Sequence, residues 1–303
     1  MTSLSNLYPL PRRAALHAVG AGALGGLLSA CTLAPDADHT DAEAPKVVPL
    51  ARRPRVAWVF SSGGPRGFAH VGVIKALEEL KLQPDLLVGA SVGSLVATIC
   101  ASGKSAAHIE QLALELSPLA LGRYALGADE RLSGSAIADL ARREAGTDML
   151  EHLNRPVVCV AARKSTGELM AFNAGDLGLA VQASCAIEGQ FTPVRIRGQQ
   201  YVDPDHYQPM PVRLARQLGA LKVLAVDASA HEYKAPAGSE RYRAGDQRKR
   251  ALTEPDARAA DIALHPDFGY WVSMSREFRQ RAIQAGYQHT MDHAARIVAL
   301  HQT

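Results

Sequence analysis

Apolar and polar positions follow two alternating periods from Arg55 onward. Short runs that are apolar at every position, Val56–Phe60 and Leu86–Val88, are each followed by a longer stretch with helical spacing, Phe68–Leu80 and Val92–Ala101. Continuous apolar runs are typical of strands buried on both faces, and their alternation with helices indicates βαβ units. The pattern predicts an α/β fold with a mainly parallel central sheet.

The same criteria place further elements toward the C-terminus. Additional strands are expected at Val157–Ala162, Glu168–Phe172, Lys222–Asp227 and Asp261–Leu264. Additional helices are expected at Ala107–Leu116, Ser133–Glu144, Pro211–Leu218 and Met274–Leu300. The polar stretch His231–Asp256 carries a basic cluster and is expected to be a solvated loop, with contact to anionic lipid headgroups as the alternative.

The first residues differ from the rest and resemble a bacterial export signal. Arg12 and Arg13 precede an apolar stretch, Ala14–Leu28, that is short for a membrane span. Leu28-Ser29-Ala30-Cys31 resembles a lipobox, where a precursor is cleaved and Cys31 is lipidated. An uncleaved anchor with an incidental cysteine is the alternative, and the paired arginines also faintly suggest a twin-arginine route.

Three parts of the chain follow from this interpretation. Residues 1–30 are a lipoprotein signal peptide, residues 31–53 a flexible tether rich in Ala, Pro, Asp and Thr, and residues 54–303 the folded domain. Thr32 after the cysteine suggests, by lipoprotein sorting rules, the periplasmic face of the outer membrane. Taking Arg12 and Arg13 from the 33 basic residues leaves 31 against 30 acidic ones, so charge argues against a nucleic-acid partner.

A GxSxG pentapeptide, Gly89 to Gly93, lies between the second apolar strand and the helix after it. A nucleophile elbow holds its serine in a strained strand-to-helix turn, and the flanking glycines allow that turn to close. The motif alone occurs often by chance, but its position after a strand and before a helix fits the requirement. We therefore expect Ser91 to be a nucleophile, with Gly89 and Gly93 as the motif glycines.

A second glycine cluster, Ser62-Gly63-Gly64-Pro65-Arg66-Gly67, follows the first strand and opens a helix. Backbone N–H groups in such a turn can converge on an anion and stabilise an oxyanion. A nucleotide phosphate loop is the rival interpretation, but neither GxxxxGK[ST] nor GxGxxG is present. The cluster thus predicts an oxyanion hole next to the elbow.

Together these motifs resemble the patatin-like phospholipase family. The resemblance is strong from about Arg55 to Ser229 and looser to Leu300. It implies a three-layer α/β/α sandwich and a Ser-Asp dyad without histidine. By resemblance the serine is Ser91, the aspartate is Asp203, and the oxyanion site is at Gly63 and Gly64 with Arg66 and Gly67 beside them.

Two departures from the family pattern affect this site. Ser62 replaces the first glycine of the family's triplet, and Pro65 has no N–H to donate. Asp203 is followed by Pro204 and Asp205, whereas glycine and then glycine or alanine are usual in the family. A second carboxylate tends to raise the pKa of one of the pair, so the turn either damages or retunes the dyad.

The resulting functional prediction is a serine acyl hydrolase that cleaves lipid esters through an acyl-enzyme and is held to a membrane by Cys31. The alternative is a catalytically weak patatin-fold lipoprotein that binds lipid or a protein partner. His70 is expected to be a packing residue, while His206 is a candidate for contact with substrate. No metal or cofactor is predicted. Cys100, Cys159 and Cys185 are expected to be buried hydrophobes.

Overall fold

The computed structural model describes residues 37–117, 123–124 and 132–302. The expected signal peptide and Cys31 lie outside the described residues. Within the described part of the chain, no helix is both long and apolar enough to cross a membrane.

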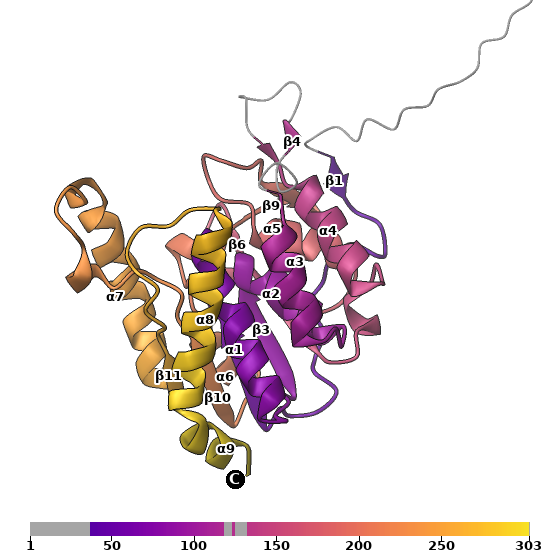
Figure 1. The fold of residues 1–303 in the computed structure, drawn as a ribbon. Helices are drawn as coiled ribbons and strands as arrows, with labels where there is room; N and C mark the ends of the chain where they lie inside the picture. The colour runs from indigo at the N-terminus through magenta and orange to yellow at the C-terminus, as the bar shows by residue number, and fades with distance from the viewer. Residues whose placement is uncertain (1–36, 118–122, 125–131, 303) are drawn as a thin grey trace, which may run out of the picture. The chain divides into compact units, whose positions relative to one another are not determined.

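A central sheet organises the domain (Figure 1). In the described residues it contains nine strands in the order β1-β8-β9-β6-β3-β2-β10-β11, with β7 paired to β6. Their bounds are β1 Asp38–His39, β2 Val56–Phe60, β3 Leu86–Ala90, β6 Val157–Arg163, β7 Leu169–Phe172, β8 Val194–Ile196, β9 Gln199–Val202, β10 Lys222–Val226 and β11 Ile262–Leu264. Strands β6, β3, β2, β10 and β11 are parallel, whereas β7 and β9 run antiparallel to β6. A separate pair, β4 Arg123–Tyr124 and β5 Leu132–Ser133, forms a short antiparallel ladder.

The helices of the described residues include those that the apolar pattern predicts and two that it does not, at Leu177–Ser184 and Arg243–Ala259. Their bounds are α1 Phe68–Glu79, α2 Val92–Ala101, α3 Ala106–Glu115, α4 Ser135–Ala145, α5 Leu177–Ser184, α6 Val212–Gln217, α7 Arg243–Ala259, α8 Arg276–Asp292 and α9 Ala294–Gln302. The long helix expected at Met274–Leu300 is divided at His293 into α8 and α9.

Each central strand is buried on both faces, which explains its continuous apolar sequence. In β2, Trp58 and Phe60 pack into one core with α1, α2 and α8, whereas Ala57 and Val59 pack into a second core with α6. Successive side chains of a strand point to opposite faces, so the five residues of β2 contribute to both cores. The three-layer α/β/α sandwich is confirmed.

The stretch expected to be a solvated loop instead contains α7. This helix carries few apolar residues, and its two buried residues are Thr253 and Asp256. Asp256 is fully buried and accepts hydrogen bonds from the Arg213 backbone N–H at 2.8 Å and from Gln208 Nε2 at 2.7 Å, while Arg213 Nη2 forms an ion pair with it at 3.0 Å. Polar contacts rather than an apolar stripe hold α7, so hydrophobic periodicity did not predict it.

The expected tether also differs from the structure from Asp38 onward. Strand β1 pairs with β8, and the Lys46 N–H donates to Ala174 O at 2.9 Å. Ala44 is fully buried, and Arg197 Nη1 donates to Pro45 O at 2.8 Å. This part of residues 31–53 therefore belongs to the folded domain.

Candidate active site

Ser91 occupies a sharp turn between β3 and α2. Its φ of 55° is positive, which is strained for a residue with a side chain. A Cβ atom at Gly89 would lie 2.3 Å from Gly93 O, and one at Gly93 would lie 2.3 Å from Phe60 O. Neither position has room for a side chain, so the two glycines permit the turn that presents Ser91, as the GxSxG pattern predicts.

Hydrogen bonds from neighbouring elements fix the backbone of this turn. The Ser91 N–H donates to Ser184 Oγ at 2.9 Å, and the Ser184 hydroxyl donates to Val160 O at 2.6 Å. On the helix side, the Ser94 hydroxyl donates to Ser91 O at 2.7 Å. These bonds hold the strained conformation and leave the Ser91 hydroxyl free of this network.

Sheet register brings Asp203 to the same place from a distant part of the sequence. Val160 of β6 pairs with Ala90 of β3, and Ala162 pairs with Val202 of β9. Ser91 follows Ala90 and Asp203 follows Val202, so both lie opposite Ala161 of β6, one on each side of that strand. Ser91 is 4% exposed and Asp203 is 2% exposed, so the two groups meet in a site largely closed to water.

The two oxygens of the Asp203 carboxyl group differ in their surroundings. Oδ1 accepts a hydrogen bond from the Asp205 N–H at 2.9 Å, whereas the buried Oδ2 has no hydrogen-bond partner among the described residues. The Ser91 hydroxyl lies beside this carboxyl group and acts to lower its pKa. A catalytic hydrogen bond is often long or poorly aligned before substrate binds. Oδ2 is thus the oxygen available to accept the Ser91 proton.

Burial is the main influence on the ionisation of Asp203. It raises the pKa of Asp203 to about 7, and the Asp205 charge adds to this effect, whereas Ser91, the Asp205 N–H and Lys249 act in the opposite direction. Desolvation disfavours the charged carboxylate, and the nearby cation partly offsets that penalty. The second carboxylate of the unusual turn is therefore a smaller influence than burial itself.

The glycine cluster forms the loop between β2 and α1, with Gly64–Gly67 as a short 3-10 helix. The N–H groups of Gly63 and Gly64 donate to no other described residue, and Gly64 has a φ of 53°. The Arg66 N–H is already used, since it donates to Gly63 O at 3.1 Å. The N–H groups of Gly63 and Gly64 are therefore available to donate to an oxyanion, whereas the N–H of Arg66, also placed at this site by the family resemblance, is not.

Arg66 and Gly67 have other roles in this loop. The Arg66 guanidinium donates to Tyr270 O and lies 5.8 Å from the centre of the Phe268 ring. A Cβ atom at Gly67 would lie 2.5 Å from Val92 Cγ1, so glycine allows the loop to pack on the first turn of α2. Both residues thus help to place the loop beside the elbow.

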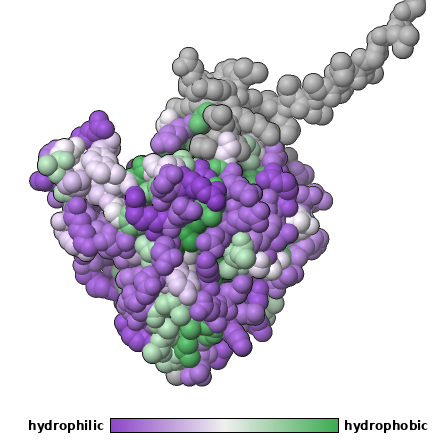
Figure 2. Space-filling model, viewed as in Figure 1, coloured by the Kyte–Doolittle hydropathy of each residue, from purple (hydrophilic) through white to green (hydrophobic). Residues whose placement is uncertain are grey.

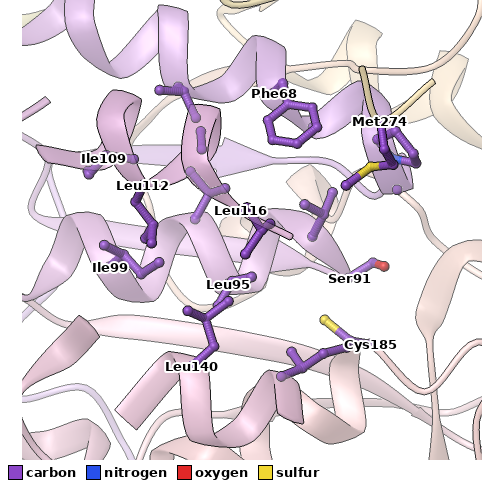
Figure 3. Close-up of a pocket in the computed structure, with 18 of the residues that line it drawn as sticks. Phe68, Ser91, Leu95, Ile99, Ile109, Leu112, Leu116, Leu140, Cys185 and Met274 are labelled. Atoms are coloured by element: carbon purple, nitrogen blue, oxygen red, sulfur yellow. The ribbon is translucent and has the colours of Figure 1, made fainter. Parts of the chain in front are cut away.

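An apolar cavity of about 200 Å³ opens at Ser91 (Figure 3). Its wall is formed by side chains of helices α1 to α4, with Cys185 and Met274 near the serine; labelled members are Phe68, Leu95, Ile99, Ile109, Leu112, Leu116 and Leu140. The face of the molecule seen in Figure 2 is mainly hydrophilic. Much of the apolar lining, including Phe68, Leu95 and Ile99, is buried. The cavity suits an alkyl chain that extends from a group bonded to Ser91.

A second cavity, of about 270 Å³, meets the first at Ser91 and Gly64 but has a polar lining. Its charged or titratable side chains are Arg66, Glu188, Asp203, Asp205, His206, Asp246 and Lys249. Ser91 therefore lies between an apolar cavity and a polar cleft. That arrangement matches the two parts of an acyl ester, an alkyl chain and a polar leaving group.

Comparison with known proteins agrees with this geometry. The family model for patatin-like phospholipase matches residues 58–216, which is more than half of the chain. The chain belongs to the patatin-like phospholipase family. The matched segment contains the glycine loop, the elbow and Asp203, so all three parts of the site lie within the family's domain.

Patatin-like relatives differ greatly in size. A protein of the NTE family from Mycobacterium bovis is 32% identical over 181 residues, covering 59% of this chain and 50% of that protein. Human patatin-like phospholipase domain-containing protein 6 is 29% identical over 187 residues, covering 58% of this chain and 14% of the human protein. The chain thus spans half or less of the length of these relatives. The crystal structure of VipD from Legionella pneumophila shares the fold, with a TM-score of 0.55 at 14% identity, covering 82% of this chain and 70% of VipD.

Two histidines and a cysteine near the site differ in their surroundings. His70 is fully buried, its Nε2 lies 2.9 Å from Ser61 O, and burial lowers its pKa to about 4, which fits a packing residue. His206 is exposed and lines the polar cleft. Burial raises the pKa of the Cys185 thiol well above its usual value, so Cys185 is not a competing thiolate nucleophile.

Sequence reasoning missed three charged side chains of the polar cleft, Glu188, Asp246 and Lys249. Lys249 of α7 forms an ion pair with Asp205 at 2.5 Å and lines the polar cleft. The basic cluster of which it is part was noticed, but nothing in the local pattern separates Lys249 from Arg248 or Arg250. Only the docking of α7 brings this lysine to the turn after Asp203.

Proposed function

We propose that this patatin-like protein hydrolyses carboxylic ester bonds of lipids through a Ser91-Asp203 dyad and an acyl-enzyme. The observation that carries the proposal is the position of Ser91, strained at the elbow, beside the unpaired Asp203 Oδ2 and at the junction of an apolar and a polar cavity. An ester whose acyl chain fills the apolar cavity would present its carbonyl carbon to Ser91 Oγ. The polar leaving group would then lie in the cleft.

The first half-reaction forms the acyl-enzyme. Asp203 Oδ2 accepts the Ser91 proton as Oγ bonds to the carbonyl carbon, and the N–H groups of Gly63 and Gly64 stabilise the negative oxygen. The intermediate collapses by breaking the bond to the leaving oxygen, which takes the proton from Asp203. In the second half-reaction water gives its proton to Asp203 and attacks the acyl carbon. Ser91 then leaves, regains the proton, and a fatty acid is released.

The proposal is tested by turnover of esters and lysophospholipids with the protein and its Ser91→Ala variant. We expect ester cleavage by the wild type and loss of that activity in the variant, because no other group replaces the nucleophile. A folded wild type that binds lipid without cleaving any ester would favour the alternative, a lipid-binding protein of the same fold. Cleavage that survives in Ser91→Ala would contradict the assignment of the nucleophile.

Membrane attachment is a separate proposal and depends on residues outside the described part of the chain. Leu28-Ser29-Ala30-Cys31 is the sequence feature that supports it, and a lipid on Cys31 would keep the site near bilayer substrate, at the periplasmic face of the outer membrane. Mass spectrometry of the mature protein is expected to show an acylated N-terminal Cys31. An uncut Met1 or a free Cys31 thiol would contradict it.

A further inference from the structure

Two of the residues at which this chain departs from the patatin pattern, Ser62 and Asp205, are in contact with each other. The Ser62 hydroxyl donates to Asp205 Oδ1. Lys249 joins both, because its Nζ lies 2.5 Å from Asp205 Oδ1 and 3.1 Å from Ser62 Oγ. Ser62, which replaces a family glycine, and Asp205, which replaces a glycine or alanine, therefore form one polar cluster with a lysine, which we call the Lys249 cluster.

This cluster links the two loops on which the proposed reaction depends. Ser62 directly precedes Gly63 and Gly64, whose N–H groups are the oxyanion donors. Asp205 follows Asp203 by two residues, and its backbone N–H donates to Asp203 Oδ1 at 2.9 Å. A change at the Lys249 cluster would thus reach both the base and the oxyanion loop.

The position of Lys249 is fixed by more than its own ion pair. Helix α7 is held to the domain by the buried contacts of Asp256 with Arg213 and Gln208, about two turns further along the helix. The Lys249 side chain is 19% exposed and the Asp205 side chain 33% exposed. Because the ion pair is partly desolvated, it should act more strongly than an exposed surface pair.

We propose that Lys249 is a positioning residue, which pairs with Asp205 and joins the turn after Asp203 to the glycine loop. The proposal rests on the Ser91-Asp203 dyad proposed above. It explains how the Asp203-Pro204-Asp205 sequence is compatible with a dyad, since the Lys249 cation partly offsets the repulsion between Asp205 and the charge that Asp203 carries as the base.

Electrostatics around the dyad support this role. Burial acts to raise the pKa of Asp205, but Lys249 and the Ser62 hydroxyl outweigh it, so that the pKa is lowered and Asp205 stays ionised. Lys249 also acts to lower the pKa of Asp203. The other charged or titratable groups around Asp203 are Cys185 beside it and Arg66, Glu188, His206 and Asp246 in the same cleft.

The decisive experiment is the pH profile of kcat/KM for a charge cycle at the Lys249 cluster. Lys249→Met leaves Asp205 unpaired, so the acid limb should move up by roughly one pH unit. Asp205→Asn leaves Lys249 unpaired, so the limb should move down. In the double variant both charges are absent, and the limb should return close to the wild-type position.

Two further variants separate charge from packing. Lys249→Arg keeps the cation and is expected to retain the wild-type pH profile. Arg248→Met removes an exposed cation from the same helix, one residue away, and is expected to leave the profile unchanged. Thermal unfolding of each variant identifies any that fails to fold, and the opposite shifts of the two single variants cannot arise from a common loss of structure.

The outcomes also distinguish this inference from the proposed function. If the wild type cleaves esters through Ser91 but Lys249→Met and Arg248→Met have the same pH profile, Lys249 is an ordinary ion-pair partner and the inference is wrong. Shifts of the same sign in Lys249→Met and Asp205→Asn would overturn it equally. If Ser91→Ala keeps the activity, the dyad itself is wrong and the inference falls with it.

Discussion

The apolar cavity and the polar cleft meet at Ser91 but are built from different kinds of structure. Side chains of regular helices, α1 to α4, form most of the cavity wall, whereas loops, the turn after β9 and one face of α7 form the cleft. Under the proposed function, the cavity has to bury only an alkyl chain. The cleft has to hold several charges at once and must balance them in pairs. We infer that binding energy comes mainly from the cavity and that the cleft determines the protonation state of the base.

The largest effect is expected where the two regions join, at Asp203. The Asp203→Asn variant should lower kcat/KM by roughly 10²- to 10⁴-fold, because a neutral amide cannot accept the Ser91 proton. The measurement is the steady-state hydrolysis of a soluble ester. A loss of less than about tenfold would mean that proton transfer does not depend on Asp203.

A smaller effect is expected from shortening the apolar cavity at Ile99, which Figure 3 shows away from Ser91. The larger side chain of Ile99→Phe should exclude about two methylene groups, and at about 0.8 kcal/mol each this lowers kcat/KM for long acyl chains roughly tenfold. Short-chain esters should be cleaved as before.

The matched control for this change is Ile74→Phe. Ile74 is equally buried in the same core, at 3% exposure, but it does not line the apolar cavity. Both substitutions overfill the core, so a loss due to strain would appear in both variants. A chain-length preference that is unchanged in Ile99→Phe, or changed equally in both, would break the assignment of the cavity to the acyl chain.

A separate effect concerns stability rather than turnover, through the burial of Asp203. Its pKa is about 7 in the folded protein and near 4 when unfolded, so between these values the folded state holds a proton that the unfolded state has released. The free energy of unfolding should therefore fall as pH rises from 4 to 7 and then level off. The neutral side chain of Asp203→Asn does not titrate, so its free energy of unfolding does not fall in this way. That free energy should exceed the wild-type value by a few kcal/mol at pH 8 and by less at pH 5. Chemical denaturation at both values measures this, and an equal difference at the two pH values would contradict it.

Features that depend on local apolar patterns were predicted from the sequence. Strand β2 and helix α2 begin and end where the apolar pattern places them, because both are defined by local burial. The elbow could also be predicted from the sequence, because Gly89 and Gly93 are required by the close backbone contacts of the turn itself. The family resemblance then supplied Asp203, which no local pattern identifies.

Features that depend on long-range polar contacts were missed or misread. Helix α7 has no apolar stripe and is attached through Asp256, so its sequence resembled a solvated loop. Residues from Asp38 were expected to be a tether because their pairing partner, β8, lies far along the chain. The contact between Ser62, Asp205 and Lys249 joins three separate segments, and composition cannot place such residues together.

We propose that Ser91 is the nucleophile and that its acyl group enters the apolar cavity. The most direct test is labelling with alkyl fluorophosphonates of short and long chain, followed by mass spectrometry of the labelled peptide. We expect a single adduct on Ser91, formed faster by the long-chain probe, absent from Ser91→Ala and much slower in Asp203→Asn. An adduct on another residue, or equal labelling rates for the two chain lengths, would contradict the account.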